Sequence, residues 1–361
     1  MKKKVLKRTG IALLTVVALA VVIAGGYVAY LFATYSRLED NLPLEVAGAA
    51  EQAAPVGEPV SIVTWNLGFG AYSADYSFFM DGGIESRAYS AEAVRENIGA
   101  MLDALAGLDP DLALLQEIDV DATRSHHIDE SALVTEAFPE RDAVFAQNYD
   151  SAYLFYPLTE PHGASRAGQM TLSRFGIDSA LRRSLPIETG VMKFFDLDRC
   201  YSVSRIPTAD GRELCLYNLH LSAYTSDGSI VAEQLDMLLS DMAGEAAAGN
   251  YAVAGGDFNM DLLGNSAEVF GVSGEDYTWA QPFPTELLPE GISLVSSLDA
   301  DAPVASCRNA DRPYEPGTSF TLTVDGFLVS DNVTVLGCEV VDEGFAHSDH
   351  NPVQMTFQLG E

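Results

Sequence analysis

The stretch Ala254-Gly255-Gly256-Asp257-Phe258-Asn259 decides the fold, because it places two polar side chains directly after an apolar run. The run 251–254 predicts a short buried strand. The two glycines predict a bend where a side chain would obstruct a ligand. Asp257 and Asn259 lie two positions apart, so in an extended segment they point to the same side and can hold a water and a phosphate oxygen together. A plain strand-to-turn junction has the same composition, so the rest of the chain must decide.

The charge of the chain is strongly acidic and unevenly placed. The formal net charge of the 361 residues is −32, and all 52 acidic residues lie at or after Glu39. From residue 34 onward 15 basic residues stand against 52 acidic ones, a balance of −37. Such a domain repels nucleic-acid phosphates and has no basic stripe, which disfavours a nucleic-acid substrate. A bound cation would change the local field, so this class stays open.

The N-terminus carries the signature of a membrane segment. Residues 11–33 are almost wholly apolar and long enough to cross a bilayer as a helix, and the basic residues within 1–10 predict a cytoplasmic N-terminus. A cleaved signal peptide, cut near Ala18-Leu19-Ala20 or later, is the alternative. The apolar run exceeds a usual signal core, which favours the anchor. Residues 34–57, rich in Ala, Glu, Pro and Gly, are predicted to be a linker before a globular domain at 58–361.

The globular part alternates strand patterns with a few amphipathic helices. Helices are predicted within 90–108 and 230–243, and the region 262–317 has no regular pattern. Several neighbouring strands resemble hairpins, which predicts two packed sheets flanked by helices in a layered α/β domain. A doubly wound fold would need a helix after nearly every strand, so it is excluded. Strands are predicted at 60–65, 111–118, 143–147, 169–175, 201–206, 214–220, 251–254, 321–330, 334–341 and 353–359.

The four cysteines are too few for a disulfide scaffold. In an exported domain they could form up to two bridges, and the three connectivities remain open. A hairpin turn at 208–211 would place Ser204 opposite Cys215, which argues against a pair of Cys200 with Cys215. No spacing with histidine indicates zinc. The other two cysteines are Cys307 and Cys338.

Polar side chains recur where the predicted strands end. For any one of them, a solvated or packed role is at least as common as a catalytic one. Their repetition at strand ends predicts a shared site, because loops converge where strands finish in layered α/β proteins. The residues are Asn66, Glu117, His220, Asp257, Asn259, Asp325, Asp349 and His350.

Taken in order, these motifs resemble those of the endonuclease/exonuclease/phosphatase superfamily, the DNase I-like fold, from about Val60 to Leu359. The resemblance implies a four-layer α/β/β/α sandwich and hydrolysis of phosphoester bonds that depends on Mg²⁺, with Mn²⁺ as a substitute. The family includes nucleases, inositol-phosphate phosphatases and sphingomyelinases. The motifs are Thr64-Trp65-Asn66, Leu115-Gln116-Glu117, Asn218-Leu219-His220-Leu221, Gly256-Asp257-Phe258-Asn259, Asp325-Gly326-Phe327-Leu328-Val329 and Ser348-Asp349-His350-Asn351-Pro352.

The resemblance also implies a metal site. Glu117 would be the principal ligand, with Asn66 beside it and Asp349 close by. This set suits Mg²⁺, which prefers oxygen ligands and keeps several waters, so that one or two protein carboxylates suffice.

The remaining polar residues would carry the hydrolysis. By the resemblance, Asp257 orients and deprotonates the attacking water while Asn259 donates to the phosphate. His220 and His350 would contact the phosphoryl oxygens, and Asp325 would hold His350 and stabilise its imidazolium. Phosphoester hydrolysis needs these parts, namely an oriented water, charge neutralisation and a protonated leaving group.

The sequence therefore favours a membrane-anchored, outward-facing phosphoesterase that acts on a phospholipid headgroup or another small phosphoester. A surface nuclease is the first alternative. A catalytically silent binding domain is the second, and it is disfavoured because every expected position keeps a competent side chain. Among the scarce cations, Arg124 follows Glu117 by seven residues and could reach a substrate phosphate. A surface ion pair is the commoner role for such an arginine.

Overall fold

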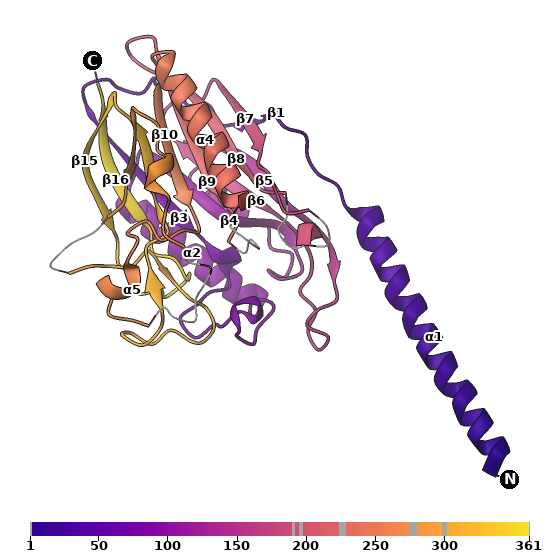
Figure 1. Cartoon of the computed structure of the whole chain (residues 1–361). Coiled ribbons are helices and arrows are strands. Elements are labelled where there is room, and N and C mark those ends of the chain that lie inside the picture. Colours follow the sequence, from indigo (N-terminus) through magenta and orange to yellow (C-terminus); the bar gives the residue numbers. More distant parts are fainter. Residues whose placement is uncertain are drawn as a thin grey trace. The chain divides into compact units, whose positions relative to one another are not determined.

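A computed structural model describes residues 2–189, 192–194, 198–223, 229–273, 279, 281–297 and 302–360. The chain divides into two units, Met1–Arg37 and Leu38–Glu361. The first unit contains the helix α1 (Lys2–Thr34) (Figure 1). Within its segment Lys4–Thr34, an 18-residue window has a mean hydropathy of 2.5, and the segment is long and apolar enough to cross a membrane. Signal sequences share these properties, so the anchor and the cleaved signal both remain open.

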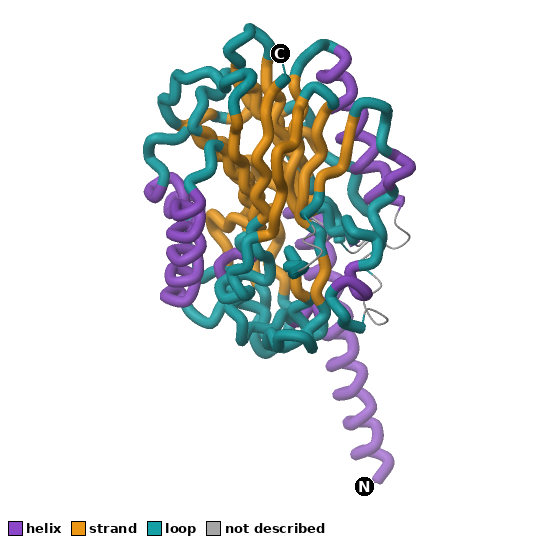
Figure 2. The backbone as a smooth tube through the Cα atoms, turned by 90° about the vertical axis from the view of Figure 1, so that its left-hand side faces the viewer, coloured by secondary structure: helices purple, strands orange, loops and turns teal. Residues whose placement is uncertain are grey.

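The second unit is built on two seven-stranded mixed sheets (Figure 2). Only the pairs β9–β10 and β3–β4 are parallel, and the other neighbours are antiparallel. The first sheet runs in the order β1 (Leu42–Leu44), β7 (Ser179–Ser184), β8 (Cys200–Pro207), β9 (Glu213–His220), β10 (Tyr251–Asp257), β14 (Asp325–Ser330) and β11 (Ile292–Val295). The second runs in the order β15 (Val333–Val340), β16 (Val353–Leu359), β3 (Pro59–Asn66), β4 (Leu112–Ala122), β6 (Gly163–Ser173), β5 (Asp142–Leu154) and β2 (Val46–Ala47).

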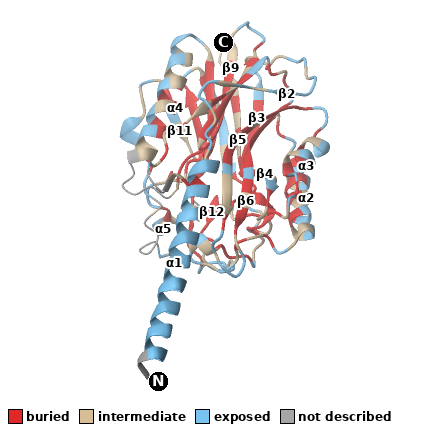
Figure 3. Ribbon diagram, turned by 90° about the vertical axis from the view of Figure 1, so that its right-hand side faces the viewer, coloured by how far each residue is buried: buried red, intermediate tan, exposed pale blue. Residues whose placement is uncertain are grey.

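The sheets pack face to face and helices cover their outer faces (Figure 3). The helices α2 (Ala91–Leu108) and α3 (Glu130–Ala137) pack on the second sheet, and α4 (Ser229–Ala247) packs on the first. The core between the sheets contains side chains such as Leu114 and Phe327, both fully buried. This is the predicted four-layer α/β/β/α sandwich, and the fold prediction is confirmed.

The sequence sets the limits of α2 through its caps. Ser90 accepts a hydrogen bond from the Ala93 N–H at the start of the helix, which satisfies one free donor there. Asp109 has a left-handed backbone and Pro110 follows it, so the helix ends as predicted. Each large apolar side chain buried on the inner face stabilises the fold by roughly 1.5–3 kcal/mol. These side chains are Val94, Ile98, Met101, Leu102 and Leu105.

The predicted linker is wrong over five of its residues. Residues 42–44 pair with β7 and residues 46–47 pair with β5, so this stretch adds one edge strand to each sheet. The strand pattern was hidden because both segments are short and separated by Glu45. The segment after α1 is therefore part of the second unit from Leu38 onward rather than a free stalk.

Five further elements were missed in the sequence. In β7 the fully buried Arg182 interrupts the apolar alternation that would have marked a strand. In α3 only eight residues form the helix, too few to show a clear periodicity. The strand β11 lies inside the region predicted to be irregular, which also contains α5 (Ser266–Val269) and β12 (Cys307–Arg308), the partner of β13 (Thr321–Leu322).

All four cysteine thiols are free in the structure. The hairpin between β8 and β9 places Arg205, not Ser204, opposite Cys215. The predicted register was one residue off because the turn contains five residues, 208–212, rather than four. The conclusion that Cys200 does not pair with Cys215 is unaffected.

Candidate active site

The strand register brings three of the predicted residues side by side. Asp257 ends β10, where it lies opposite His220 of the parallel strand β9 and opposite Asp325 of the antiparallel strand β14. In the second sheet, Asn66 ends β3 beside Gln116 of β4. The carboxyl ends of these parallel strands meet at the same end of the sandwich, as expected for ligand sites in layered folds.

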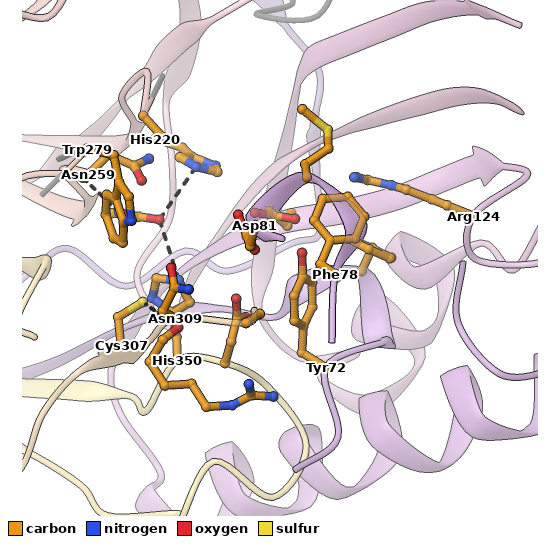
Figure 4. A pocket seen from close by; sticks show the side chains of 18 of the residues that line it. Tyr72, Phe78, Asp81, Arg124, His220, Asn259, Trp279, Cys307, Asn309 and His350 are labelled. Carbon is orange, nitrogen blue, oxygen red and sulfur yellow. Dashed lines mark hydrogen bonds and ion pairs between the residues drawn. The ribbon is translucent and has the colours of Figure 1, made fainter. Parts of the chain in front are cut away.

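A cavity of about 190 Å³ opens at this end. Six of the eight predicted site residues line it, and Asn66 and Asp325 support them from behind. Figure 4 shows His220, Asn259 and His350 on one side of the cavity, facing Tyr72, Phe78 and Arg124 on the other. The six that line it are Glu117, His220, Asp257, Asn259, Asp349 and His350.

Two histidines flank the Asp257 carboxylate. The Oδ2 atom of Asp257 lies 3.5 Å from His220 Nε2 and 3.7 Å from His350 Nε2. Burial, reinforced by the charge of Asp325 and opposed by His350, raises the pKa of Asp257 to about 7. The carboxylate is therefore suited to take a proton near neutral pH.

The two histidines have opposite protonation tendencies. Burial lowers the pKa of His350, but the charge of Asp325 and the hydrogen bond to it outweigh burial and raise the pKa well above its usual value. Burial, together with the nearby Arg199, lowers the pKa of His220 well below its usual value. At neutral pH the site thus holds an imidazolium at His350 and a neutral ring at His220, a donor and an acceptor.

A buried hydrogen-bond chain fixes His350. Its Nδ1 donates to Asp325 Oδ2 at 2.8 Å. The same carboxylate oxygen accepts from the Ser306 hydroxyl at 2.7 Å, and Ser306 Oγ accepts from the backbone N–H of Asp325 at 3.1 Å. With Asp325 fully buried, the imidazole can neither rotate nor lose its counter-charge without cost.

Carboxylates gather on the second-sheet side of the cavity. Asn66 Nδ2 donates to Glu117 Oε1 at 3.2 Å and to Asp257 Oδ2 at 3.1 Å. Burial and the charge of Glu117 raise the pKa of Asp349 to about 6, although His350 and Arg308 oppose the rise. Neither Glu117 nor Asp349 forms an ion pair with a described residue. Two mutually repelling carboxylates that no described side chain joins in an ion pair fit a divalent cation with oxygen ligands.

The amide oxygen of Asn66 does not point toward the expected metal site. Its Oδ1 accepts from the Gly68 N–H at 3.0 Å while its nitrogen faces the two carboxylates. Ligation by Asn66 would require the amide to flip, and oxygen and nitrogen of an amide are assigned from such networks. In the present arrangement Asn66 holds Glu117 and Asp257 together.

Another group of potential ligands adjoins this site. Ligand atoms of Asp257, Asp325 and His350 all lie within 4.8 Å of one another. His350 Nδ1 already donates to Asp325, and an imidazolium cannot bind a metal. The carboxylates of Glu117 and Asp349 therefore offer the better cation site.

Glu117 reaches the cavity from a β-bulge. Leu115 pairs with Met170 and Ile118 with Gly168, so two residues of β4 oppose one of β6. The backbone of Glu117 has φ of +54°, a conformation that costs energy in a residue with a side chain. Bulges turn side chains toward active sites, and this one directs the carboxylate into the cavity.

A buried amide network joins the two sheets behind the site. Gln116 donates to Asn218 Oδ1 at 2.9 Å, and Gln169 donates to the Asn218 carbonyl at 2.6 Å. All three side chains are fully buried. The network thus fixes the strands that carry Glu117 and His220 relative to each other.

The glycines and Asn259 of the stretch 254–259 have roles that differ from the predicted ones. A Cβ on Gly256 would lie 2.0 Å from the Leu219 carbonyl oxygen, and one on Gly255 would lie 2.6 Å from Phe327. The glycines are needed for strand packing, not for approach of a ligand. Asn259 has a left-handed backbone with φ of +52°, so it reaches the cavity through a turn and not through an extended segment.

Cations and aromatic rings of the cavity were mostly missed in the sequence. Arg124 is half-buried, with 11% of its side chain exposed; it pairs with the buried Asp119 at 2.9 Å and lies 3.9 Å from the centre of the Phe69 ring. Arg124 does form an ion pair, but not on the outer surface as predicted, because its guanidinium lines the cavity. Arg308, 1% exposed, donates to the Ser73 carbonyl at 3.1 Å. Nothing in its irregular sequence context marked it.

The sequence matches the Endonuclease/Exonuclease/phosphatase family over residues 63–350. No curated protein sequence matches the chain. Among solved structures, an endonuclease/exonuclease/phosphatase from Beutenbergia cavernae is similar, with 16% identity, a TM-score of 0.55 and coverage of 84% of this chain and 72% of that one.

Two further structures share the fold. ANGEL2, a 2′,3′-cyclic phosphatase in complex with adenosine-2′,3′-vanadate, has 16% identity and a TM-score of 0.56 over 88% of this chain and 99% of its own. TDP2 from D. rerio, complexed with a single-strand DNA product, has 16% identity and a TM-score of 0.52 over 83% and 99%. The family match over most of the chain shows that it belongs to the Endonuclease/Exonuclease/phosphatase family, whose members are metal-dependent phosphoesterases and nucleases.

Proposed function

We propose that this chain is a membrane-anchored, outward-facing phosphoesterase that uses Mg²⁺ and acts on a phospholipid headgroup or another small phosphoester. The observation that carries the proposal is the Asp257 carboxylate, with a pKa of about 7, within 4 Å of His220 and His350 and across the cavity from unpaired carboxylates. This arrangement suits activation of a water beside a phosphorus atom.

In the proposed reaction, Asp257 orients the attacking water and takes its proton. The imidazolium of His350 donates a hydrogen bond to a phosphoryl oxygen or to the leaving oxygen, and Asp325 keeps it charged. Asn259 donates one amide hydrogen to the Leu221 carbonyl at 2.7 Å, which leaves its second for a phosphoryl oxygen. A cation held by Glu117 and Asp349 would neutralise charge on the phosphoryl group.

The size and charge of the site support a small substrate. A cavity of about 190 Å³ is smaller than most pockets that enclose drug-sized ligands. The balance of −37 beyond residue 34 opposes a polyanion that would cross the domain surface. A nuclease remains the second candidate because the rings of Tyr72, Phe78 and Trp279 line the cavity and could stack on a base.

The anchoring rests on α1 and on the charges before it. In our proposal residues 1–10 stay in the cytoplasm, residues 11–33 span the membrane and residues 38–361 form the catalytic domain outside. Oxygen-rich sites of this kind accept Mg²⁺, with Mn²⁺ as a substitute.

The full-length protein in detergent is tested with Mg²⁺ on phosphatidylcholine and sphingomyelin, inositol phosphates, a chromogenic phosphodiester and plasmid DNA. We expect hydrolysis of a lipid or small ester that stops with a chelator and in Asp257→Asn. Cleavage of DNA alone, with a steep loss at rising salt, would replace the proposal by the nuclease. Turnover of no phosphoester would leave only the silent binding domain.

A further inference from the structure

Exposed apolar side chains gather beside the mouth of the cavity. Among the described residues of the second unit, only eight large hydrophobic side chains are exposed, and five of them lie on two loops, 78–87 and 155–162. We call these five the mouth patch. They are Met80 (45% exposed), Ile84 (81%), Phe155 (53%), Tyr156 (67%) and Leu158 (85%).

The two loops form one surface. The ring centres of Phe79 and Tyr156 lie 5.7 Å apart. The Ser86 hydroxyl donates to the Glu160 carbonyl at 2.6 Å, and Arg87 Nε donates to the Pro161 carbonyl at 2.6 Å. These bonds hold the apolar side chains on a fixed support, so the patch is part of the folded domain.

The mouth patch is continuous with the cavity. Met80 belongs to the patch and also lines the cavity, as do its neighbours Phe78 and Asp81. Figure 4 shows Phe78 on the side of the cavity opposite His350, and Asp81 between the two sides. A surface that binds the patch would therefore lie next to the site of hydrolysis.

A short spacer joins α1 to the second unit. Only residues 35–37 separate Thr34, the end of the helix, from Leu38, and this spacer extends to at most about 14 Å. The Leu38 N–H donates to Asp198 Oδ2 at 2.9 Å, and the next residue, Arg199, lines the cavity. If α1 spans a bilayer, the spacer holds Leu38, the first residue of the second unit, within about 14 Å of the helix end.

We propose that the mouth patch inserts into the surface of a phospholipid bilayer, so that the cavity takes a phosphoester presented by a lipid of that bilayer. The proposal rests on the proposed function and narrows its substrate to a membrane lipid. Apolar and aromatic side chains are the groups that enter the interface between headgroups and acyl chains.

The charge of the loops identifies the kind of bilayer. The two loops carry three acidic residues, Asp81, Glu85 and Glu160, against the single cation Arg87. Anionic lipids would repel such a surface, whereas a zwitterionic headgroup such as phosphocholine would not. Insertion is therefore driven by apolar area, and high salt leaves it unchanged.

The first test places a fluorescent label on the patch. Leu158→Cys carries the label, and Leu336→Cys, at an exposed leucine on β15, is the matched control. The buried thiols Cys200, Cys215 and Cys307 are shielded from the dye, and unsubstituted protein gives the background. Both full-length variants are reconstituted in phosphatidylcholine vesicles that contain brominated lipid.

We expect the bromine to quench about half or more of the fluorescence at position 158 and little at position 336, because an interfacial side chain lies about 5–10 Å deep. Equal quenching at the two positions overturns the proposal. The label at position 158 should stay fluorescent in detergent without lipid. If its fluorescence is lost there too, a protein partner or a second copy covers the patch, and the proposal is overturned as well.

The second test separates the patch from the chemistry. The double variant Ile84→Ser/Leu158→Ser, which changes no cavity residue, is assayed on phosphatidylcholine vesicles and on a soluble chromogenic phosphodiester. We expect about a tenfold lower rate on vesicles and an unchanged soluble rate, with Leu336→Ser unchanged on both. An unchanged vesicle rate overturns the proposal. Wild-type protein that hydrolyses neither substrate contradicts the proposed function, while the quenching still decides the insertion.

Discussion

Replacement of Asp325 by Asn isolates the counter-charge that keeps His350 an imidazolium. The substitution preserves the shape of the side chain and a hydrogen bond to Ser306, but removes the charge 2.8 Å from His350 Nδ1. With about 4 Å between the charge centres and an effective dielectric constant of about 20, the lost attraction is about 4 kcal/mol. If that energy is needed in the transition state, kcat falls about 10³-fold.

The variant should also change the pH profile. With Asp325 neutral, burial dominates and the pKa of His350 falls, so the imidazolium is lost at lower pH than in the wild type. The alkaline limb of the rate profile then moves to lower pH. The assay is turnover of a chromogenic phosphodiester with Mg²⁺ between pH 5 and 9, the range in which histidines titrate.

Asp261→Asn is the matched control for this variant. Asp261 is also buried and follows β10, but it accepts bonds only from the loop, from the N–H groups of Leu263, Gly264 and Ser266 and from the Ser266 hydroxyl. Its replacement should lower stability and leave kcat intact. A value of kcat in Asp325→Asn within tenfold of the wild type would refute the role given to Asp325.

Three further variants test other parts of the site. Glu117→Gln should weaken Mg²⁺ binding more than about tenfold by calorimetry, and unchanged affinity would remove Glu117 from the metal site. Arg124→Met, made with Asp119→Asn to avoid an unpaired buried charge, should raise KM about tenfold or more, because a charge-assisted bond to phosphate is lost. Burial lowers the pKa of His162 to about 4, so the unfolded chain binds its proton more readily and the free energy of unfolding falls by up to about 3 kcal/mol from pH 6.5 to 4. His162→Gln should lose that part of the pH dependence in urea titrations, and an unaltered dependence would contradict a buried neutral ring.

The sequence predicted the layers and the strand ends because these depend on local patterns. Trp65 and Asn66 end a strand in which the alternation of apolar and polar residues is visible in the sequence. The register of β9, β10 and β14 places His220, Asp257 and Asp325 together. The motifs also named Glu117 and His350, both of which line the cavity.

The rest depends on contacts between distant segments, which leave no local pattern. The fully buried Arg182 hid a strand, and Arg308 reaches the cavity from an irregular region, where backbone carbonyls hold it. The left-handed backbone of Glu117 comes from a bulge that only the pairing of β4 with β6 reveals. The mouth patch likewise joins loops more than 60 residues apart.

The most direct test of the account is the position of a bound cation. We predict that a crystal soaked in Mn²⁺ shows one anomalous peak within about 2.5 Å of a carboxylate oxygen of Glu117, on the side facing Asp349. A peak among Asp257, Asp325 and His350, or no peak at either place, would contradict the division of the site into a cation side and a proton-transfer side.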